Sequence, residues 1–215
     1  MKNPFIYICG IGPGHPDYIL PKVFRRVADS DLLIGGKRHL SLFDCTGKET
    51  FALSSNIDDI VCRLRQLLQH NPNGKQVTLL VSGDTGFHSL LGTMERYFSP
   101  DDYVVIPGIS SFQYLFAQVG MSYHDAHITS IHGIDADVVD LVRKHSKLFL
   151  LTDARRSWNH IAQLLCDNGL GEYKMIVGNR LSYPDETIIR KTARELVNEE
   201  HEFGLCSVII LNPFR

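Results

Sequence analysis

Glycine-rich loops are the segments of this sequence whose residue types and spacing best suit chemistry. The first, Gly10 to Gly14, reads Gly-Ile-Gly-Pro-Gly and follows the apolar run Phe5 to Cys9 directly. Glycine lets the backbone adopt positive φ or approach another atom closely, because it has no Cβ. A strand that ends in such a loop predicts a ligand site, although an ordinary tight turn after a first strand is the alternative.

The first loop does not match the phosphate-binding motifs of nucleotide-binding proteins. A dinucleotide fingerprint would place a third glycine where His15 stands. Pro13 and Pro16 each lack the backbone N–H that a phosphate cradle uses. No Gly-Lys-Ser or Gly-Lys-Thr follows the loop, so the Walker pattern is also missing. We therefore expect a loop built for close approach and not for phosphate.

Two further glycine loops follow predicted strands. Ser82-Gly83-Asp84-Thr85-Gly86 comes after Val77 to Val81, and Pro107-Gly108-Ile109-Ser110-Ser111 comes after Tyr103 to Ile106. In open α/β sheets, ligands gather beyond the carboxyl ends of the strands. Three such loops together predict one site at this edge of a sheet.

Three polar residues of these loops each have a structural alternative. Asp84 is the only acid of the three loops, and it can also be a turn-forming Asp that bonds its own backbone. Ser110 and Ser111 can cap the helix that follows them, and this role can coexist with ligand binding.

Apolar runs and helical patterns alternate along almost the whole chain, which predicts an α/β fold with largely parallel strands. The clearest helix spans Ile57 to Gln69, where apolar residues recur at helical spacing. Other helices are predicted over 18–28, 87–97, 111–120, 136–145 and 157–168. Strands are predicted over 5–9, 31–34, 77–81, 103–106, 128–131, 148–151, 175–177 and 206–211.

The order of these elements predicts two α/β lobes with a cleft between them. The boundary is expected near Gly120, which gives an N-terminal lobe over residues 1–120 and a C-terminal lobe over 121–215. The N-terminal lobe should hold a mostly parallel sheet. The segments 185–190 and 208–211 are expected to be antiparallel strands, which would make the sheet of the C-terminal lobe mixed.

Composition excludes several classes of protein. The net charge of the 215-residue chain is −2, which argues against nucleic acid as a partner. No apolar stretch approaches the roughly 20 residues of a membrane span, and no signal-peptide pattern is present, so we expect a soluble, cytoplasmic protein. The five cysteines form no Cys-x-x-Cys pair, and His124 and His127 lack a third ligand of clear spacing. We therefore expect no metal site.

Taken in order, the three loops resemble those of the tetrapyrrole methylase family, which transfers methyl groups from S-adenosylmethionine. The segments 130–133, 150–153 and 179–186 extend the resemblance over the full length of the chain. Within the family, these segments are most similar to the branch that methylates C5 of a cobalt-precorrin in cobalamin biosynthesis. Thr85 departs from the pattern, because much of the family carries proline there; Gly83 and Asp84 match it.

The resemblance implies the two-lobed tetrapyrrole methylase fold, with S-adenosylmethionine folded in the cleft. Carried over residue by residue, the donor site would comprise Pro13, Ser82, Gly83, Asp84, Phe87, Ser110, Ser111, Leu151, Asn179 and Arg180. The chemistry of these positions agrees. The donor has no phosphates and carries a sulfonium cation, which carbonyls, hydroxyls and one carboxylate suit better than a nest of N–H groups.

The implied substrate is a large ring with many carboxylates, cobalt-precorrin-6B, whose methylated product is cobalt-precorrin-7. His132 is a candidate for binding this substrate; it can also be a general base or pack locally. Arg38 can bond ring carboxylates, as can Lys37, Arg155 and Arg156, or these can be solvated surface charges. No residue is assigned as catalytic, because positioning alone can accelerate methyl transfer.

The resemblance also implies a homodimer and a second enzyme. The chain is too short to contain the C15-methyltransferase and decarboxylase domain that is fused to the C5 domain in some relatives, so a separate protein would perform that step. Two alternatives stay open. One is a methylase of the same fold acting at another precorrin position, on a diphthamide precursor or on ribosomal RNA. The other is a nucleotide-binding oxidoreductase or a non-catalytic binding module.

Overall fold

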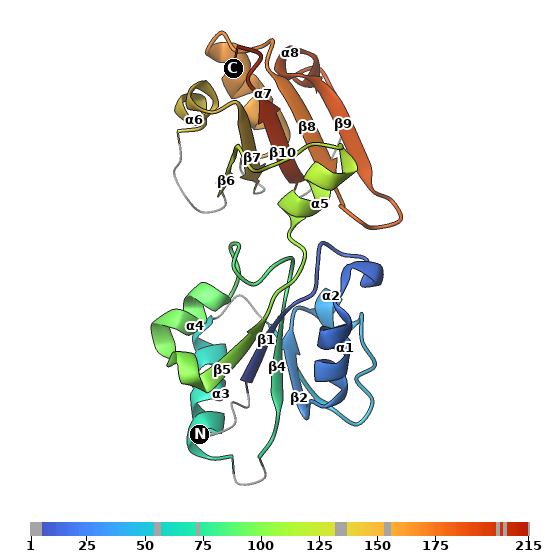
Figure 1. Cartoon of the computed structure of the whole chain (residues 1–215), viewed down its shortest axis with the longest axis vertical. Coiled ribbons are helices and arrows are strands. Elements are labelled where there is room, and N and C mark those ends of the chain that lie inside the picture. The colour runs from blue at the N-terminus through green and yellow to red at the C-terminus, as the bar shows by residue number, and fades with distance from the viewer. Residues whose placement is uncertain are drawn as a thin grey trace. The chain divides into compact units, whose positions relative to one another are not determined.

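The chain folds into two compact units, Met1–Ser110 and Ser111–Arg215, each with one five-stranded sheet (Figure 1). The computed structural model describes residues 6–53, 57–71, 74–131, 137–152, 156–200, 203 and 206–214. Among these residues, no helix has the length and apolar character to cross a membrane.

The first unit contains a parallel sheet with strand order β3-β2-β4-β1-β5. Its strands are β1 (Ile6–Gly10), β2 (Leu32–Gly35), β3 (Glu49–Ala52), β4 (Val77–Val81) and β5 (Tyr103–Ile106). Its α-helices are α1 (Pro21–Ala28), α2 (Lys37–Leu40), α3 (Ile57–Gln69) and α4 (Leu91–Tyr97), and its 3-10 turns are η1 (Pro16–Tyr18) and η2 (Pro100–Asp102).

The central strands of this sheet are apolar on both faces. All five residues of β4 are buried, as expected where helices cover both sides of a parallel sheet. Along β1, Ile8 belongs to the core that includes Leu64 of α3, whereas Cys9 belongs to the core that includes Val23 of α1. Figure 1 shows α3 and α4 on one side of the sheet and α1 on the other.

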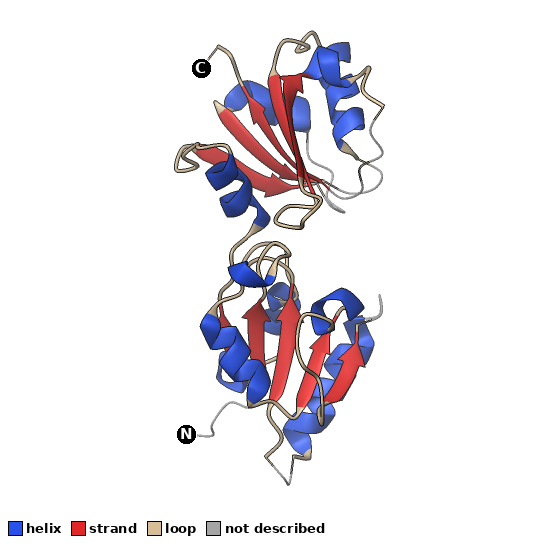
Figure 2. Ribbon diagram, turned by 90° about the vertical axis from the view of Figure 1, so that its right-hand side faces the viewer, coloured by secondary structure: helices blue, strands red, loops and turns tan. Residues whose placement is uncertain are grey.

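The second unit contains a mixed sheet with strand order β6-β7-β10-β8-β9 (Figure 2). β6 and β7 are parallel, β10 is antiparallel to both β7 and β8, and β9 is antiparallel to β8. The strands are β6 (Ala126–Ser130), β7 (Lys147–Leu151), β8 (Lys174–Asn179), β9 (Thr187–Thr192) and β10 (Cys206–Leu211). The helices are α5 (Ser111–Gln118), α6 (Val138–Lys144), α7 (Trp158–Asp167) and α8 (Ala193–Leu196).

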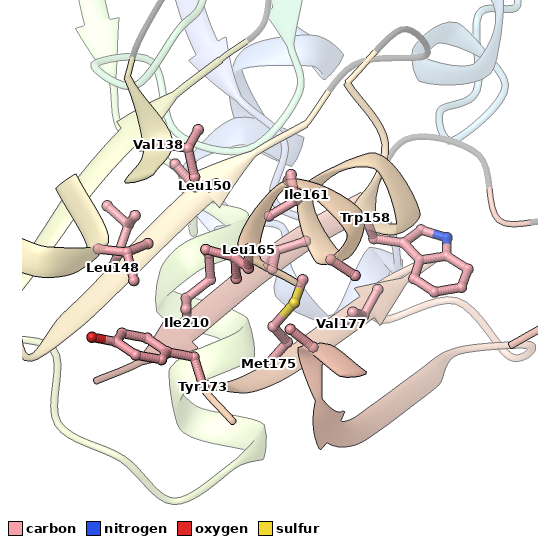
Figure 3. Packing of buried hydrophobic residues seen from close by; sticks show 14 of the residues in the cluster. Val138, Leu148, Leu150, Trp158, Ile161, Leu165, Tyr173, Met175, Val177 and Ile210 are labelled. Carbon is pink, nitrogen blue, oxygen red and sulfur yellow. The ribbon is translucent and has the colours of Figure 1, made fainter. Parts of the chain in front are cut away.

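Both faces of the second sheet are covered. On one face, α6, α7 and α8 pack against alternate residues of the strands, among them Leu150 and Val177 (Figure 3). On the other face, the rings of Phe112 and Phe116 of α5 lie 5.9 and 6.5 Å from the ring of Phe149 on β7. Phe116 and Phe149 are fully buried, so α5 is an integral part of this unit.

The α/β fold class and the mostly parallel and mixed sheets are confirmed. Among the strands and α-helices of the described residues, the prediction missed β3, α2 and α8. Each has only four residues, which is too short for a periodic pattern to be recognised. β3 is also an edge strand whose residues are mainly exposed, so no apolar run marks it.

The predicted pairing of segments 185–190 and 208–211 is wrong. β9 and β10 do not pair with each other; both pair with β8, one on each side and both antiparallel. The chain thus inserts its last strand between β7 and β8 instead of beside β9. Sequence spacing cannot show this, because a short connection favours a neighbour but does not require one.

Residues 111–120 belong to the second unit, whereas the sequence-based division grouped them with the first. The cause is the packing of α5: a Cβ placed on Gly178 of β8 would lie 3.0 Å from the Leu115 side chain, which shows how closely the helix approaches that strand. The change of unit therefore falls between Ser110 and Ser111, inside the third glycine loop.

Candidate functional site

The structure brings the three glycine loops together at the carboxyl edge of the first sheet. β4, β1 and β5 are parallel neighbours, so their carboxyl ends lie side by side. Gly12 and Gly83 exchange two backbone hydrogen bonds: the Gly12 N–H donates to Gly83 O at 3.1 Å, and the Gly83 N–H donates to Gly12 O at 2.8 Å. The first and second loops are thereby joined directly.

Glycine is required in these loops mainly by contacts between their backbones. A Cβ on Gly10 would lie 2.6 Å from Gly108 N, and one on Gly108 would lie 2.2 Å from Gly83 O. Real Cβ atoms do not approach other heavy atoms so closely, so Gly10 of the first loop and Gly108 of the third are needed for the loops to meet. Gly83 of the second loop is required for a different reason, its backbone conformation. Its φ is +67°, and a Cβ there would have no heavy atom closer than Ser110 Cα at 3.7 Å.

Asp84 joins the second loop to the third. Its Oδ1 accepts a hydrogen bond from Gly86 N–H at 2.8 Å, and its Oδ2 accepts one from Gly108 N–H at 3.1 Å. The bond to Gly86 is the turn-forming role that the sequence left open. Each carboxylate oxygen retains a second lone pair, so these bonds do not prevent Asp84 from facing a ligand.

The other predicted residues of the first unit lie on the same loops with different exposure. Ser82 is exposed, and Pro13 and Phe87 are half-buried. The Phe87 ring contacts the His88 ring edge-on, with 4.7 Å between centroids. Ser110 is buried, and Ser111, the first residue of α5, already belongs to the second unit.

Leu151 and Asn179 lie at one edge of the second sheet. β7 and β8 end there and flank β10, which begins there: Leu151 pairs with Ser207, and Asn179 pairs with Cys206. Two of the four predicted donor-site residues of this unit are thus separated by one strand. Asn179 is 9% exposed, and its Oδ1 is 4.0 Å from the Cys206 thiol.

Thr152 is a residue of this edge that the site prediction missed. Its hydroxyl donates to Cys206 O at 2.8 Å and accepts from Cys206 N–H at 3.0 Å, so the side chain extends the pairing of β7 with β10 by one residue. The available signal was a hydroxyl residue directly after a buried strand. Burial raises the pKa of the Cys206 thiol to about 12, which keeps it protonated and unreactive.

Arg180 begins the loop between β8 and β9 in a left-handed conformation, with φ +48°. Its Nε is 2.5 Å from Asp185 Oδ2, and its guanidinium lies over the Tyr183 ring at 4.9 Å. The hydrogen bond from Arg180 lowers the pKa of the Asp185 carboxyl. Because Asp185 holds the side chain, we expect the backbone of Arg180, and not its guanidinium, to be the part that contacts a ligand.

The predicted substrate-binding residues are only partly described. Arg38 lies on α2 and is exposed, as is Lys37 before it. Arg156 is half-buried in the second unit, whereas His132 and Arg155 lie outside the described residues. In the ranges that the structure describes, no group of three or more His, Cys, Asp or Glu side chains is arranged to hold a metal ion.

The loop edge of the first unit fits a cationic methyl donor. The three loops contain one carboxylate and neither Lys nor Arg. At Gly83, an added Cβ would meet only the backbone of Ser110, at 3.7 Å, so no side chain covers the backbone on that side. An acid, free carbonyl lone pairs and no cation suit a sulfonium; a phosphate would require the opposite arrangement.

Comparison with known proteins agrees with this chemistry. The model of the family described as Tetrapyrrole (Corrin/Porphyrin) Methylases matches residues 6–197. The chain is 30% identical over 204 residues to a probable cobalt-precorrin-7 C(5)-methyltransferase from Methanocaldococcus jannaschii, covering 92% of this chain and 94% of that protein. It is 31% identical over 205 residues to the cobalt-precorrin-7 C(5)-methyltransferase of Salmonella typhimurium, covering 95% and 98%.

A longer relative aligns over only part of its length. The chain is 26% identical over 216 residues to a decarboxylating precorrin-6Y C(5,15)-methyltransferase from Sinorhizobium, covering 96% of this chain but 49% of that protein.

Solved structures share the fold. The precorrin-6Y methylase of cobalamin biosynthesis from Archaeoglobus fulgidus superposes with a TM-score of 0.72 at 18% identity, covering 97% of both chains. The uroporphyrin-III C-methyltransferase of Thermus thermophilus, complexed with S-adenosyl homocysteine, has a TM-score of 0.72 at 22% identity, covering 96% of this chain and 97% of that one.

Proposed function

Because the chain belongs to the tetrapyrrole (corrin/porphyrin) methylase family, we propose that it transfers the methyl group of S-adenosylmethionine to C5 of a cobalt-precorrin. The reaction converts cobalt-precorrin-6B to cobalt-precorrin-7 in cobalamin biosynthesis. The observation that carries the proposal is the alignment with two proteins named C(5)-methyltransferases over at least 92% of each chain.

We propose that the donor-site residues are those that the family resemblance implies. From the first unit, we propose Pro13, Ser82, Gly83, Asp84, Phe87 and Ser110; from the second, Ser111, Leu151, Asn179 and the backbone of Arg180. The converging loops support the first group, as does the absence of a side chain over Gly83 on the side where its Cβ would stand. The shared strand edge supports Leu151 and Asn179. Bound there, the donor supplies an activated methyl group on a positively charged sulfur.

The chemistry needs little from the protein beyond position. In the transfer, the bond from sulfur to the methyl carbon would break as a bond from the ring carbon forms, and the electron pair of the broken bond would return to sulfur. The ring would then release one proton, which the solvent can take up. An in-line displacement of this kind is accelerated by holding the reacting atoms close and aligned. Asp84, the acid of the loops, would stabilise the sulfonium before transfer, while the rigid junction of glycines fixes the direction of approach.

Incubation with methyl-labelled S-adenosylmethionine and cobalt-precorrin-6B tests the proposal. We expect one labelled methyl group per ring, located at C5 by NMR. Label at another ring carbon would contradict the C5 assignment but keep the family chemistry. Label on ribosomal RNA or on a diphthamide precursor, with none on the ring, would establish another substrate on the same fold.

Calorimetry separates the methylase from the other classes. We expect S-adenosyl homocysteine to bind and NADH not to bind. Binding of NADH alone would favour a nucleotide-dependent oxidoreductase, and binding of neither would favour a non-catalytic module.

We also propose that the protein is a cytoplasmic homodimer and that a separate protein carries out methylation and decarboxylation at C15. The second proposal rests on the Sinorhizobium relative, which is about twice as long as the region that this chain matches. Light scattering after gel filtration tests the dimer. The C15 proposal predicts that the product of this enzyme retains the acetate carboxylate that decarboxylation removes, which mass spectrometry of the product would detect.

A further inference from the structure

The loop between β8 and β9, residues 180–186, holds two non-glycine residues in the left-handed region. The φ angle is +48° at Arg180 and +67° at Ser182. A side chain makes this conformation unfavourable, because its Cβ lies close to the following carbonyl oxygen. Such residues persist only where the surrounding structure fixes them, and they cluster at sites that bind ligands. The loop therefore has a fixed shape that local preference does not explain.

Packing fixes the residue between these two. Leu181 is buried, and a Cβ on Gly178 would lie 2.7 Å from Leu181 Cδ2, so the Leu181 side chain folds back onto β8. Ser182 is buried as well. A backbone N–H in a buried residue requires a partner within the protein.

The Glu186 carboxylate is that partner. Its Oε2 accepts a hydrogen bond from Ser182 N–H at 2.5 Å. Two backbone bonds close the rest of the loop: Tyr183 N–H donates to Arg180 O at 3.0 Å, and Glu186 N–H donates to Tyr183 O at 3.0 Å. Glu186 is half-buried, and an N–H bonds more strongly to a carboxylate than to a neutral acceptor. A side chain at the end of the loop thus holds the backbone near its start.

Asp185, the neighbouring acid, acts on a side chain instead. It binds the Arg180 guanidinium, and both side chains are more than half exposed. Exposed ion pairs of this kind contribute little to stability. The bond to Asp185 constrains a guanidinium, whereas the bond to Glu186 constrains the main chain. Glu186 is therefore the acid whose removal should change the backbone conformation of the loop.

We propose that Glu186 is a positioning residue for the methyl donor: by accepting from Ser182 N–H, it keeps the backbone of Arg180 in its left-handed conformation before the donor binds. This role rests on the proposed donor site, which includes Asn179 and the Arg180 backbone. Asn179 is the last residue of β8, so the loop begins directly at that site. A loop that already has its bound conformation loses less conformational freedom on binding, which increases affinity.

Titration calorimetry with S-adenosyl homocysteine tests this role without requiring turnover. For Glu186→Ala, we expect about tenfold weaker binding, the equivalent of one charge-assisted hydrogen bond, and an unchanged number of sites per chain. A purely structural role would give the opposite pattern. Fewer molecules would be folded, so fewer sites would be measured, each with the affinity of the wild-type protein.

Two conservative variants separate the hydrogen bond from the charge, since a carboxylate could also attract the ammonium group of the ligand. Glu186→Gln keeps the reach of the side chain and an acceptor oxygen but has no charge. Glu186→Asp keeps the charge but is one methylene shorter. We expect Glu186→Gln to bind within about threefold of the wild-type protein, and Glu186→Asp to bind more weakly than Glu186→Gln. This comparison also decides if Glu186→Ala does not fold.

Glu172→Ala is the matched control. Glu172 is an exposed glutamate that pairs with Arg194 and precedes β8, at the other end of the strand from the loop. Its removal should leave both the affinity and the number of sites unchanged.

The outcomes separate this role from the proposed function. Wild-type affinity in Glu186→Ala, or weaker binding by Glu186→Gln than by Glu186→Asp, would overturn the positioning role and leave the methylase function in place. Failure of the wild-type protein to bind S-adenosyl homocysteine would overturn the proposed function and this role together.

Discussion

Gly108 shows how single residues in this protein are constrained by backbone contacts. A Cβ at this position would lie 2.2 Å from Gly83 O and 2.7 Å from Gly10 C, both backbone atoms of other loops. Backbone cannot move aside as the end of a flexible side chain can. The three glycine loops are therefore one interlocked unit, in which a change at Gly108 would displace the other two loops.

We expect Gly108→Ala to lower the free energy of unfolding by about 1–3 kcal/mol or more, because overpacking forces the backbone to shift. Urea denaturation followed by circular dichroism would measure this. Gly92→Ala is the matched control: Gly92 lies in α4 with nothing within 4 Å of the added Cβ, so the helix should gain up to about 1 kcal/mol. Equal stability of the two variants would contradict the interlocked arrangement.

Thr152 makes a second prediction at this scale. Thr152→Val keeps the shape of the buried side chain but leaves Cys206 N–H without its acceptor. We expect a loss of about 1–3 kcal/mol, the cost of an unpaired buried donor. Thr152→Ser retains the hydroxyl and should lose much less. Thermal unfolding of both variants decides between the two groups. A larger loss in Thr152→Ser than in Thr152→Val would mean that the methyl group, and not the hydrogen bonds, matters at this edge.

Helix α5 shows how an element can belong to a different unit from the one that its sequence position suggests. It follows β5 of the first sheet directly, yet Leu115 and Phe116 are fully buried in the second unit. Its aromatic residues cover a face of the second sheet that α6, α7 and α8 leave open. Without α5, Phe149 would be exposed.

We therefore propose that the folding boundary lies before Ser111. A fragment of residues 111–215 should fold with cooperative thermal unfolding, because it includes α5. A fragment of residues 121–215 should be unfolded or form an aggregation-prone state, since it exposes the apolar face around Phe149. Circular dichroism and gel filtration compare the two. Cooperative unfolding of the shorter fragment would move the boundary back toward Gly120.

At the scale of the whole molecule, pH should act on stability in two stages. The pKa values of His39 and His127 are lowered in the folded protein, in each case mainly by burial and further by Arg38 and His145 respectively. Their folded-state pKa values lie below that of an unfolded histidine, about 6.5, so the unfolded state binds protons first. Stability should be complete above that pH and decrease as the pH falls through it.

The second stage, at lower pH, is the loss of stability as carboxylates become protonated. Hydrogen bonds from Lys75, Lys147 and Arg180 lower the pKa values of Glu49, Asp125 and Asp185. These groups stabilise the protein above their unfolded pKa of about 4 and lose that contribution below it. Thermal melts from about pH 8 to about pH 3 should show both stages, and a variant with His39→Phe and His127→Phe should lose only the first. If the double variant still lost stability in the first stage, other histidines would be responsible for that stage.

The order of strands and helices, the class of fold and the three glycine loops could be read from the sequence, because they depend on local patterns. Buried parallel strands such as β4 are continuous apolar runs, and α3 shows helical spacing over its whole length. The mismatch of the first loop with phosphate motifs depends only on Pro13, Pro16 and His15. These features require no knowledge of which segments meet.

Contacts between distant segments were decided only by the tertiary structure. Strand β10 inserts between β7 and β8, α5 joins the second unit, and Asp84 bonds the third loop; each depends on packing between residues far apart in the chain. His39 is the clearest case. The sequence shows an ordinary histidine beside two basic residues. Only the fold reveals that its Nδ1 is buried and meets no hydrogen-bond partner in the described part of the chain, because burial is a property of the assembled strands β2 and β4 and not of α2.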